Sequence, residues 1–129
     1  MAIVFHNWHC DHLGHVNTRH YHAAFDDALV AFWAGIGSPG PEGEAFAVTA
    51  RMLTEFKTEA LAGTVARIDI GVDRIGGKSV TLGLSLKRVP DGTELARCEV
   101  TEVFFDPAAR TSAPIPERIR AALTTSEES

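Results

Sequence analysis

The side chains best suited to chemistry crowd into one short stretch near the start of the chain, at positions 8–21, which reads WHCDHLGHVNTRHY. All six histidines of the protein lie between positions 6 and 22, and Cys10 and Asp11 stand among them. Imidazole, thiolate and carboxylate groups serve in proteins as metal ligands, nucleophiles and proton acceptors. The stretch therefore allows three kinds of site: a metal centre, a cysteine nucleophile or a catalytic carboxylate.

Metal binding and cysteine chemistry are the weaker two hypotheses. The stretch has no CxxC or HExxH spacing and no second cluster of ligands follows it, so we expect no metal. Cys10 would need a base or a positive neighbour to form a thiolate, and the aspartate beside it opposes that charge. Cys98 alternates with Ala96 and Val100, which is typical of a small core residue.

A catalytic carboxylate is the hypothesis that we favour. Asp11 lies six residues before Asn17, a residue type common at helix N-caps, and Gly14 between them permits a tight turn. The carboxylate would then fold back toward the start of a helix, where unpaired N–H groups and the helix dipole favour negative charge. A carbonyl oxygen that becomes an oxyanion fits such a place, and Asp11 could attack that carbonyl or deprotonate water. The alternative is that Asp11 only caps a turn.

A helix that begins after Asn17 would position these groups. Apolar residues at helical spacing form one stripe along it, made of Tyr21, Phe25, Ala28, Leu29 and Phe32. Gly35 and Gly37 predict that the helix ends near Trp33 or Ala34. The stripe must be buried against another element, because an amphipathic helix needs a partner for its apolar face.

Strands supply that partner. Alternating apolar and polar residues predict strands at 3–8, 47–58, 64–73, 80–86 and 94–105, and a short helix is expected over 116–123. Turns at 75–78 (IGGK) and 90–93 (PDGT) join the last three strands as a meander. In the strand at 47–58, one face is expected to carry Val48, Ala50, Met52, Thr54 and Phe56. In the strand at 64–73, one face is expected to carry Ala66, Ile68, Ile70 and Val72. The fold class is therefore α+β, with an antiparallel sheet that curves around one long helix, and the exposed sheet edges favour a homodimer.

Composition sets the remaining limits. A chain of 129 residues with 45% hydrophobic and 22% charged residues is typical of one globular domain, expected over 1–123 with a frayed polar tail at 124–129. The net charge of −5 gives no attraction to nucleic acid. No stretch approaches the roughly 20 apolar residues of a membrane helix, and the first residues do not form a signal peptide. Two cysteines are too few for a disulfide framework, so we expect free thiols and a cytoplasmic location.

The run DHLGHVN at 11–17, with Tyr21 ten residues after Asp11, resembles the hotdog-fold acyl-CoA thioesterases, in particular the 4-hydroxybenzoyl-CoA thioesterase-like enzymes. The pattern shared with them is an aspartate, a glycine three residues later, a valine two residues further on and a tyrosine in the packed helix. The HVN tripeptide is also similar to that of plant acyl-ACP thioesterases, which share the fold. The order of elements agrees over about residues 2–106.

This resemblance implies specific roles. Asp11 would be the nucleophile or the general base, and the backbone N–H of Thr18 would polarise the thioester carbonyl. His15 and Asn17 would orient water or substrate. The site would lie at the interface of a homodimer or homotetramer, with an acyl-CoA as substrate and no metal or organic cofactor.

Substrate binding needs an apolar lining and a grip on phosphate. Trp8 and Tyr21 are candidates for the lining, and Arg67, Arg74 and Lys78 could hold the phosphates of the coenzyme. Two other functions remain open: a hotdog hydratase or dehydratase, and a protein that binds acyl thioesters without catalysis. The hotdog fold hosts all three, so the fold alone does not decide between them.

Overall fold

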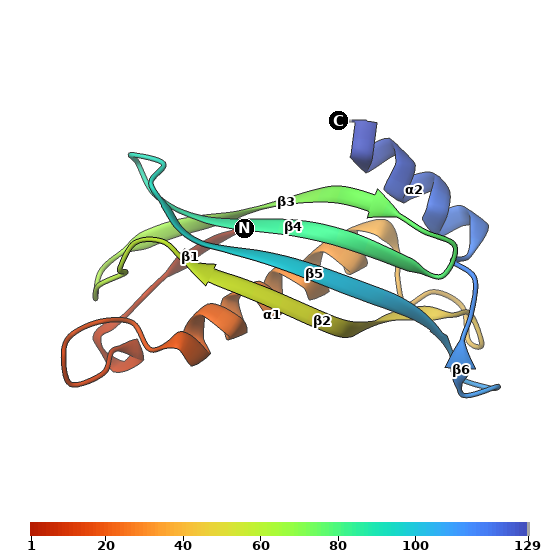
Figure 1. The fold of residues 1–129 in the computed structure, drawn as a ribbon, viewed down its shortest axis with the longest axis horizontal. Helices are drawn as coiled ribbons and strands as arrows, with labels where there is room; N and C mark the ends of the chain where they lie inside the picture. Colours follow the sequence, from red (N-terminus) through yellow and green to blue (C-terminus); the bar gives the residue numbers. More distant parts are fainter. Residues whose placement is uncertain (129) are drawn as a thin grey trace.

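An antiparallel sheet of six strands curves over a long helix in the computed structural model, which describes residues 1–128 (Figure 1). The elements follow in the order β1 (Ala2–Val4), η1 (Asn7–His9, a 3₁₀ turn), α1 (Thr18–Ile36), β2 (Phe46–Phe56), β3 (Val65–Ile75), β4 (Ser79–Arg88), β5 (Glu94–Asp106), β6 (Thr111–Ser112) and α2 (Glu117–Glu128). The sheet order is β1-β3-β4-β5-β2, with β6 paired to β5. The expected α+β arrangement is confirmed, because β3, β4 and β5 form the meander and α1 lies behind one face of the sheet.

Local signals explain the limits of α1. The side chain of Asn17 accepts a hydrogen bond from the Arg19 N–H at 3.2 Å, which confirms the expected N-cap. Gly35 stays within the helix, so α1 ends later than expected, at Ile36. Gly37 adopts a left-handed conformation (φ 93°) and donates to the carbonyls of Trp33 and Ala34, which closes the helix.

The core lies between α1 and the concave face of the sheet. Its helical side consists of Tyr21, Ala24, Phe25, Ala28, Leu29 and Trp33, all buried. Its sheet side consists of Val80, Leu82, Leu84 and Leu86 on β4 with Ala96, Cys98, Val100 and Phe104 on β5. The predicted alternation on β3 is confirmed, since Ala66, Ile68 and Val72 are buried while Arg67 and Asp69 are exposed. Cys98 is fully buried, as expected of a core residue.

The face expected for β2 is wrong at its beginning. The register with β5 shifts between Thr49 and Arg51, so Ala50 is an extra residue that interrupts the alternation. Val48 on the far side of this bulge is 40% exposed. Beyond the bulge the expected face continues, and Phe56 lies directly across from buried Ala96 but stays 49% exposed at the sheet edge.

Both ends of the chain also differ from expectation. The first strand is only Ala2–Val4, because the chain then bends into η1, where the His9 N–H donates to the His6 carbonyl at 3.0 Å. The last helix extends to Glu128, so residues 124–128 are helical where we expected a frayed tail, and residue 129 lies outside the described residues. Ile119 and Leu123 are fully buried, which ties α2 to the core. Over residues 1–128, no helix is long and apolar enough to cross a membrane.

Candidate active site

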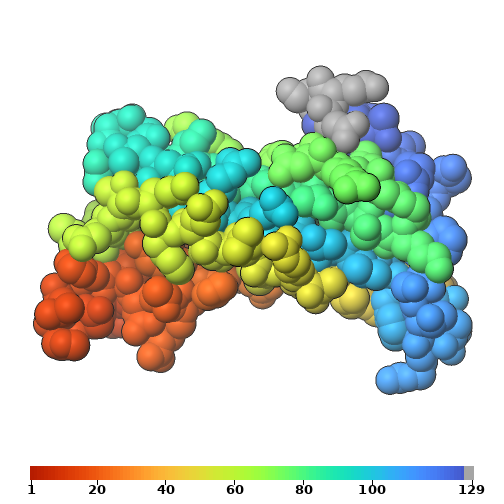
Figure 2. Space-filling view, in the orientation of Figure 1, coloured from red at the N-terminus to blue at the C-terminus, as the bar shows by residue number. Residues whose placement is uncertain are grey.

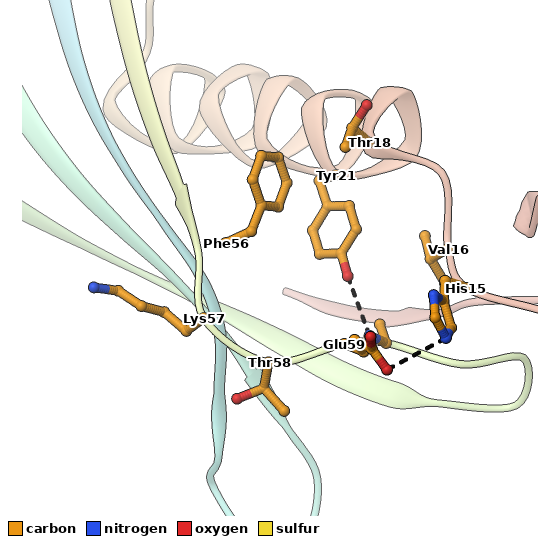
Figure 3. A pocket seen from close by; sticks show the side chains of 9 residues that line it. His15, Val16, Thr18, Tyr21, Phe56, Lys57, Thr58 and Glu59 are labelled. Carbon is orange, nitrogen blue, oxygen red and sulfur yellow. Dashed lines mark hydrogen bonds and ion pairs between the residues drawn. The ribbon is translucent and has the colours of Figure 1, made fainter. Parts of the chain in front are cut away.

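A cavity of about 230 Å³ opens between the first turn of α1 and the segment that links β2 to β3 (Figure 3). Its lining is formed by His15, Val16, Thr18, Tyr21, Phe56, Lys57, Thr58, Glu59 and Ala60. In Figure 2 the N-terminal segment (red) and the segment after β2 (yellow-green) lie against one another at one end of the molecule. Three of the residues that we expected at the site, His15, Thr18 and Tyr21, therefore share one cavity.

Hydrogen bonds fix the far wall of the cavity to α1. The Ala60 N–H donates to the Tyr21 hydroxyl oxygen at 3.2 Å, and the Ala60 carbonyl accepts from the Val16 N–H at 2.9 Å. Burial raises the pKa of the Tyr21 hydroxyl, so this group stays neutral. Tyr21 is thus both a wall of the cavity and the anchor of the segment opposite.

The residues before α1 form a small hairpin. The Asp11 N–H donates to the His15 carbonyl at 2.9 Å, and the Gly14 N–H donates to the Asp11 carbonyl at 3.0 Å. Gly14 has a φ of 82°, a conformation that favours glycine, so the predicted tight turn is confirmed. The hairpin brings position 11 level with His15, at the rim of the cavity.

The carboxylate of Asp11 does not enter the cavity in this chain. Its Oδ1 accepts hydrogen bonds from the N–H groups of Leu13 at 2.8 Å and His15 at 3.3 Å. The bond from Leu13 is the main cause that holds the pKa of Asp11 below its usual value, so the group is ionised at neutral pH. Asp11 is exposed and caps the turn, which is the alternative role that the sequence left open.

The start of α1 presents a free backbone donor. Thr18 is the first residue of the helix and lines the cavity. Among residues 1–128 the structure shows no hydrogen bond from the Thr18 N–H, whereas the following N–H, of Arg19, is taken by the Asn17 side chain. A free N–H at a helix N-terminus is suited to an oxyanion or a carbonyl oxygen.

The side chain of Asn17 caps the helix, and this role can be tested. We expect Asn17→Ala to lower the free energy of unfolding by about 1 kcal/mol, because it removes the N-cap acceptor. Chemical denaturation measures this difference, and Asn17→Ser, which keeps a cap acceptor, should stay near the wild-type value. An Asn17→Ala protein as stable as the wild type would contradict the capping role.

Sequence reasoning missed one charged partner in the cavity. Glu59 lies in the segment between β2 and β3, and its Oε2 is 3.3 Å from His15 Nε2 (Figure 3). The local sequence does not indicate that Glu59 belongs to the site, because its partner His15 lies far earlier in the chain. Lys57 also lines the cavity, but its side chain points away from this contact (Figure 3), and its Nζ lies 3.6 Å from Glu55 Oε2.

Trp8 and the predicted phosphate-binding residues lie outside this cavity. Trp8 is 71% exposed and stacks on His6. Arg67 lies on the outer face of β3, 3.5 Å from Asp69, because it alternates with buried Ala66 and Ile68. The strand register places Phe56, which lines the cavity, at the same level of the sheet as Ile68 on β3. Arg74 lies further along β3, away from the cavity, and Lys78 lies in the hairpin that follows β3. The single chain therefore brings none of the three cations to the cavity.

Three other histidines, His6, His9 and His20, form an aromatic group with Trp8 beside η1. His9 Nδ1 accepts the N–H of His6 at 2.9 Å, and its ring centroid is 4.6 Å from that of His20. Burial, with the nearby His20 and His6, lowers the pKa of His9. In the described part of the chain, no three metal-ligating side chains gather closely enough to hold a metal ion.

Comparisons with known proteins agree with this architecture. A family model described as the thioesterase-like superfamily matches residues 4–123. None of the curated proteins matches this sequence. A hypothetical protein from Staphylococcus aureus, solved in complex with CoA, is similar with a TM-score of 0.92 and 21% identity over 99% of this chain and 82% of its own. A 1,4-dihydroxy-2-naphthoyl-CoA thioesterase from Synechocystis has a TM-score of 0.83 and 13% identity, over 96% of this chain and 93% of its own. A gentisyl-coenzyme A thioesterase has a TM-score of 0.81 and 20% identity, over 95% and 98%.

Proposed function

Because this chain belongs to the thioesterase-like superfamily and has the hotdog fold, we propose that it hydrolyses an acyl-CoA thioester to a free acid and coenzyme A. The observation that carries the proposal is the free N–H of Thr18, which opens α1 inside a cavity. A similar structure with CoA bound, and others named as thioesterases of aryl-CoA esters, support the substrate class.

The reaction asks little of the protein, because a thioester is already activated. The carbonyl oxygen of the substrate would accept the Thr18 N–H and the dipole of α1 would stabilise the charge that develops on it. Asp11 would act as nucleophile on the carbonyl carbon or as general base toward water. For this the carbonyl carbon must lie at the rim of the cavity, between the hairpin that carries Asp11 and the first turn of α1.

A second copy of the chain would complete the site. β2 is the last strand of the sheet order, so its outer edge has no strand beside it within residues 1–128. Three large apolar residues on β2 are exposed: Val48, Leu53 and Phe56. Exposed sheet edges favour pairing with another strand, so we propose that the protein forms a homodimer or a larger homo-oligomer through this region.

The test is a panel of acyl-CoA esters with short, branched, aromatic and hydroxylated acyl groups, and matched acyl-carrier-protein thioesters. We expect time-dependent release of free thiol from at least one class, and the preferred acyl group identifies the substrate. Binding of CoA esters without release of thiol would overturn hydrolysis in favour of acyl-thioester binding. Addition of water to an enoyl-CoA would overturn it in favour of a hydratase.

A further inference from the structure

The cavity contains a close histidine–carboxylate contact, and the carboxylate has no role in the reaction proposed above. His15 Nε2 lies 3.3 Å from Glu59 Oε2, and the two side chains point toward one another in the cavity wall (Figure 3). We propose that Glu59 is a positioning residue that orients His15 as the base which activates water in the cavity. The proposal rests on the proposed function of thioester hydrolysis.

The backbone fixes the distance between the two side chains. His15 is followed by Val16, and Glu59 is followed by Ala60. The Val16 N–H donates to the Ala60 carbonyl at 2.9 Å, so the backbone holds the two segments together at this point. The Tyr21 hydroxyl holds the Ala60 N–H from the other side at 3.2 Å. The two chain segments therefore meet in a fixed register, which brings the two side chains close together.

The partner determines which nitrogen of His15 carries the proton. A carboxylate only accepts hydrogen bonds, so contact with Glu59 favours the form in which Nε2 is protonated. Nδ1 is then left with its lone pair. No hydrogen bond to Nδ1 is present among the 128 described residues, so this nitrogen is free to accept a proton inside the cavity.

In the proposed reaction Asp11 is the nucleophile and His15 is the base. A carboxylate oxygen of Asp11 forms a bond to the carbonyl carbon, the C–S bond breaks, and the electron pair leaves with sulfur as a thiolate. Water then attacks the acyl carbon of this anhydride while His15 Nδ1 takes one of its protons, which releases the acid and restores the Asp11 carboxylate. The imidazolium finally gives its proton to the thiolate.

Charged and polar groups from two chain segments surround the imidazole. Glu59 faces it from the segment after β2, and Asp11 lies on its own hairpin, with Oδ1 3.3 Å from the His15 backbone N–H. The neutral Tyr21 hydroxyl is another polar group of the cavity wall. Lys57 also lines the cavity, but its side chain points away from His15 (Figure 3), and its Nζ lies 3.6 Å from Glu55 Oε2. The carboxylates of Glu59 and Asp11 would stabilise the positive charge that develops on the imidazole as water is activated.

The pair is also open enough to be changed without loss of the fold. The side chains of His15 and Glu59 are 38% and 70% exposed, and ion pairs of this kind contribute little to stability. Glu59→Gln keeps an acceptor for Nε2 and removes the charge, whereas Glu59→Ala removes both. A matched control is Glu99→Gln, which breaks a similarly exposed pair, 3.2 Å from Arg51 on the outer part of the sheet.

The experiment combines steady-state and rapid-mixing kinetics of thiol release. Because a positioned base contributes about 10²–10⁴-fold, we expect His15→Ala and Glu59→Ala to turn over about 100-fold more slowly, and Glu59→Gln about 10-fold. In His15→Ala the first equivalent of thiol per site should still appear at nearly the wild-type rate. The double variant His15→Ala/Glu59→Ala should be no slower than His15→Ala, because Glu59 acts through His15.

Spectroscopy separates positioning from a merely structural role. Nitrogen NMR of the free protein should show His15 protonated at Nε2 in the wild type and a mixture of tautomers in Glu59→Ala. Glu99→Gln should match the wild type in every measurement.

The outcomes discriminate clearly. Wild-type turnover and tautomer in the Glu59 variants would overturn the proposal, as would a double variant much slower than His15→Ala. A wild-type protein that releases no thiol from any thioester would overturn the proposed function and, with it, the catalytic role of the pair. In that case the NMR spectra would still report whether Glu59 orients His15.

Discussion

Thr18→Pro is expected to lower kcat for thioester hydrolysis by about 10²–10³-fold, the contribution of one oxyanion donor, with the fold intact. Proline removes the backbone N–H that we assign to the carbonyl oxygen, together with the threonine side chain. Thr18 is the first residue of α1, where proline is favoured and where the N–H has no partner within the helix. The preceding Asn17 has φ −67° and ψ 141°, an extended conformation that a following proline permits.

The matched control for this variant is Thr18→Ala. It removes the hydroxyl and keeps the N–H, so it should retain wild-type kcat. KM should change less than kcat in Thr18→Pro, because the hydrogen bond is stronger to the oxyanion than to the ground-state carbonyl. A Thr18→Pro enzyme that melts at the wild-type temperature and turns over at the wild-type rate would exclude this N–H from the reaction.

Asp11→Asn is expected to lower kcat by about 10²-fold or more while the hairpin stays folded. The amide oxygen of asparagine can still accept the N–H groups of Leu13 and His15, so only the charge and the nucleophilic oxygen are lost. In the wild type the pKa of Asp11 lies below the usual 3.8, so its contribution is complete at neutral pH and declines only as the pH falls below that value.

Asp106→Asn provides the control for Asp11→Asn. Asp106 Oδ1 caps a similar turn, since it accepts from the N–H groups of Ala108 at 2.9 Å and Ala109 at 3.2 Å, at the end of β5. Thermal melting shows whether either change disturbs the fold. If Asp11→Asn hydrolyses thioesters as fast as Asp106→Asn, Asp11 is a turn residue and has no part in the chemistry.

Local signals allowed much of this fold to be predicted. The N-cap at Asn17 and the left-handed Gly14 depend on residues close in sequence, and both were placed correctly. The alternation on β3 follows from burial of one face, which a period of two residues reveals. On β4 the apolar residues alternate as expected, but Gly83 and Ser85 between them are buried too. Glycines near the end of α1 were less decisive, because Gly35 is tolerated within the helix while Gly37 ends it.

The features that the sequence did not reveal depend on tertiary contacts. The His15–Glu59 pair arises where the segment after β2 crosses the start of α1, and the bulge at Ala50 arises from the pairing of β2 with β5. Glu102 is another case: it is only 3% exposed, and one of its carboxylate oxygens accepts the indole N–H of Trp33 at 3.0 Å. Its position on the inner face of β5 was predictable, but a partner on α1 was not.

Phe56 belongs both to the cavity and to the edge of the sheet. Its ring packs edge-on against Tyr21 in the cavity wall, with the ring centroids 5.1 Å apart. Phe56 is also the last residue of β2, which is the edge strand of the sheet. A second chain that binds along the β2 edge would therefore also form part of the cavity wall. The same few residues would then control both association of subunits and access of substrate to the cavity, and the cavity of an isolated subunit would be open to solvent.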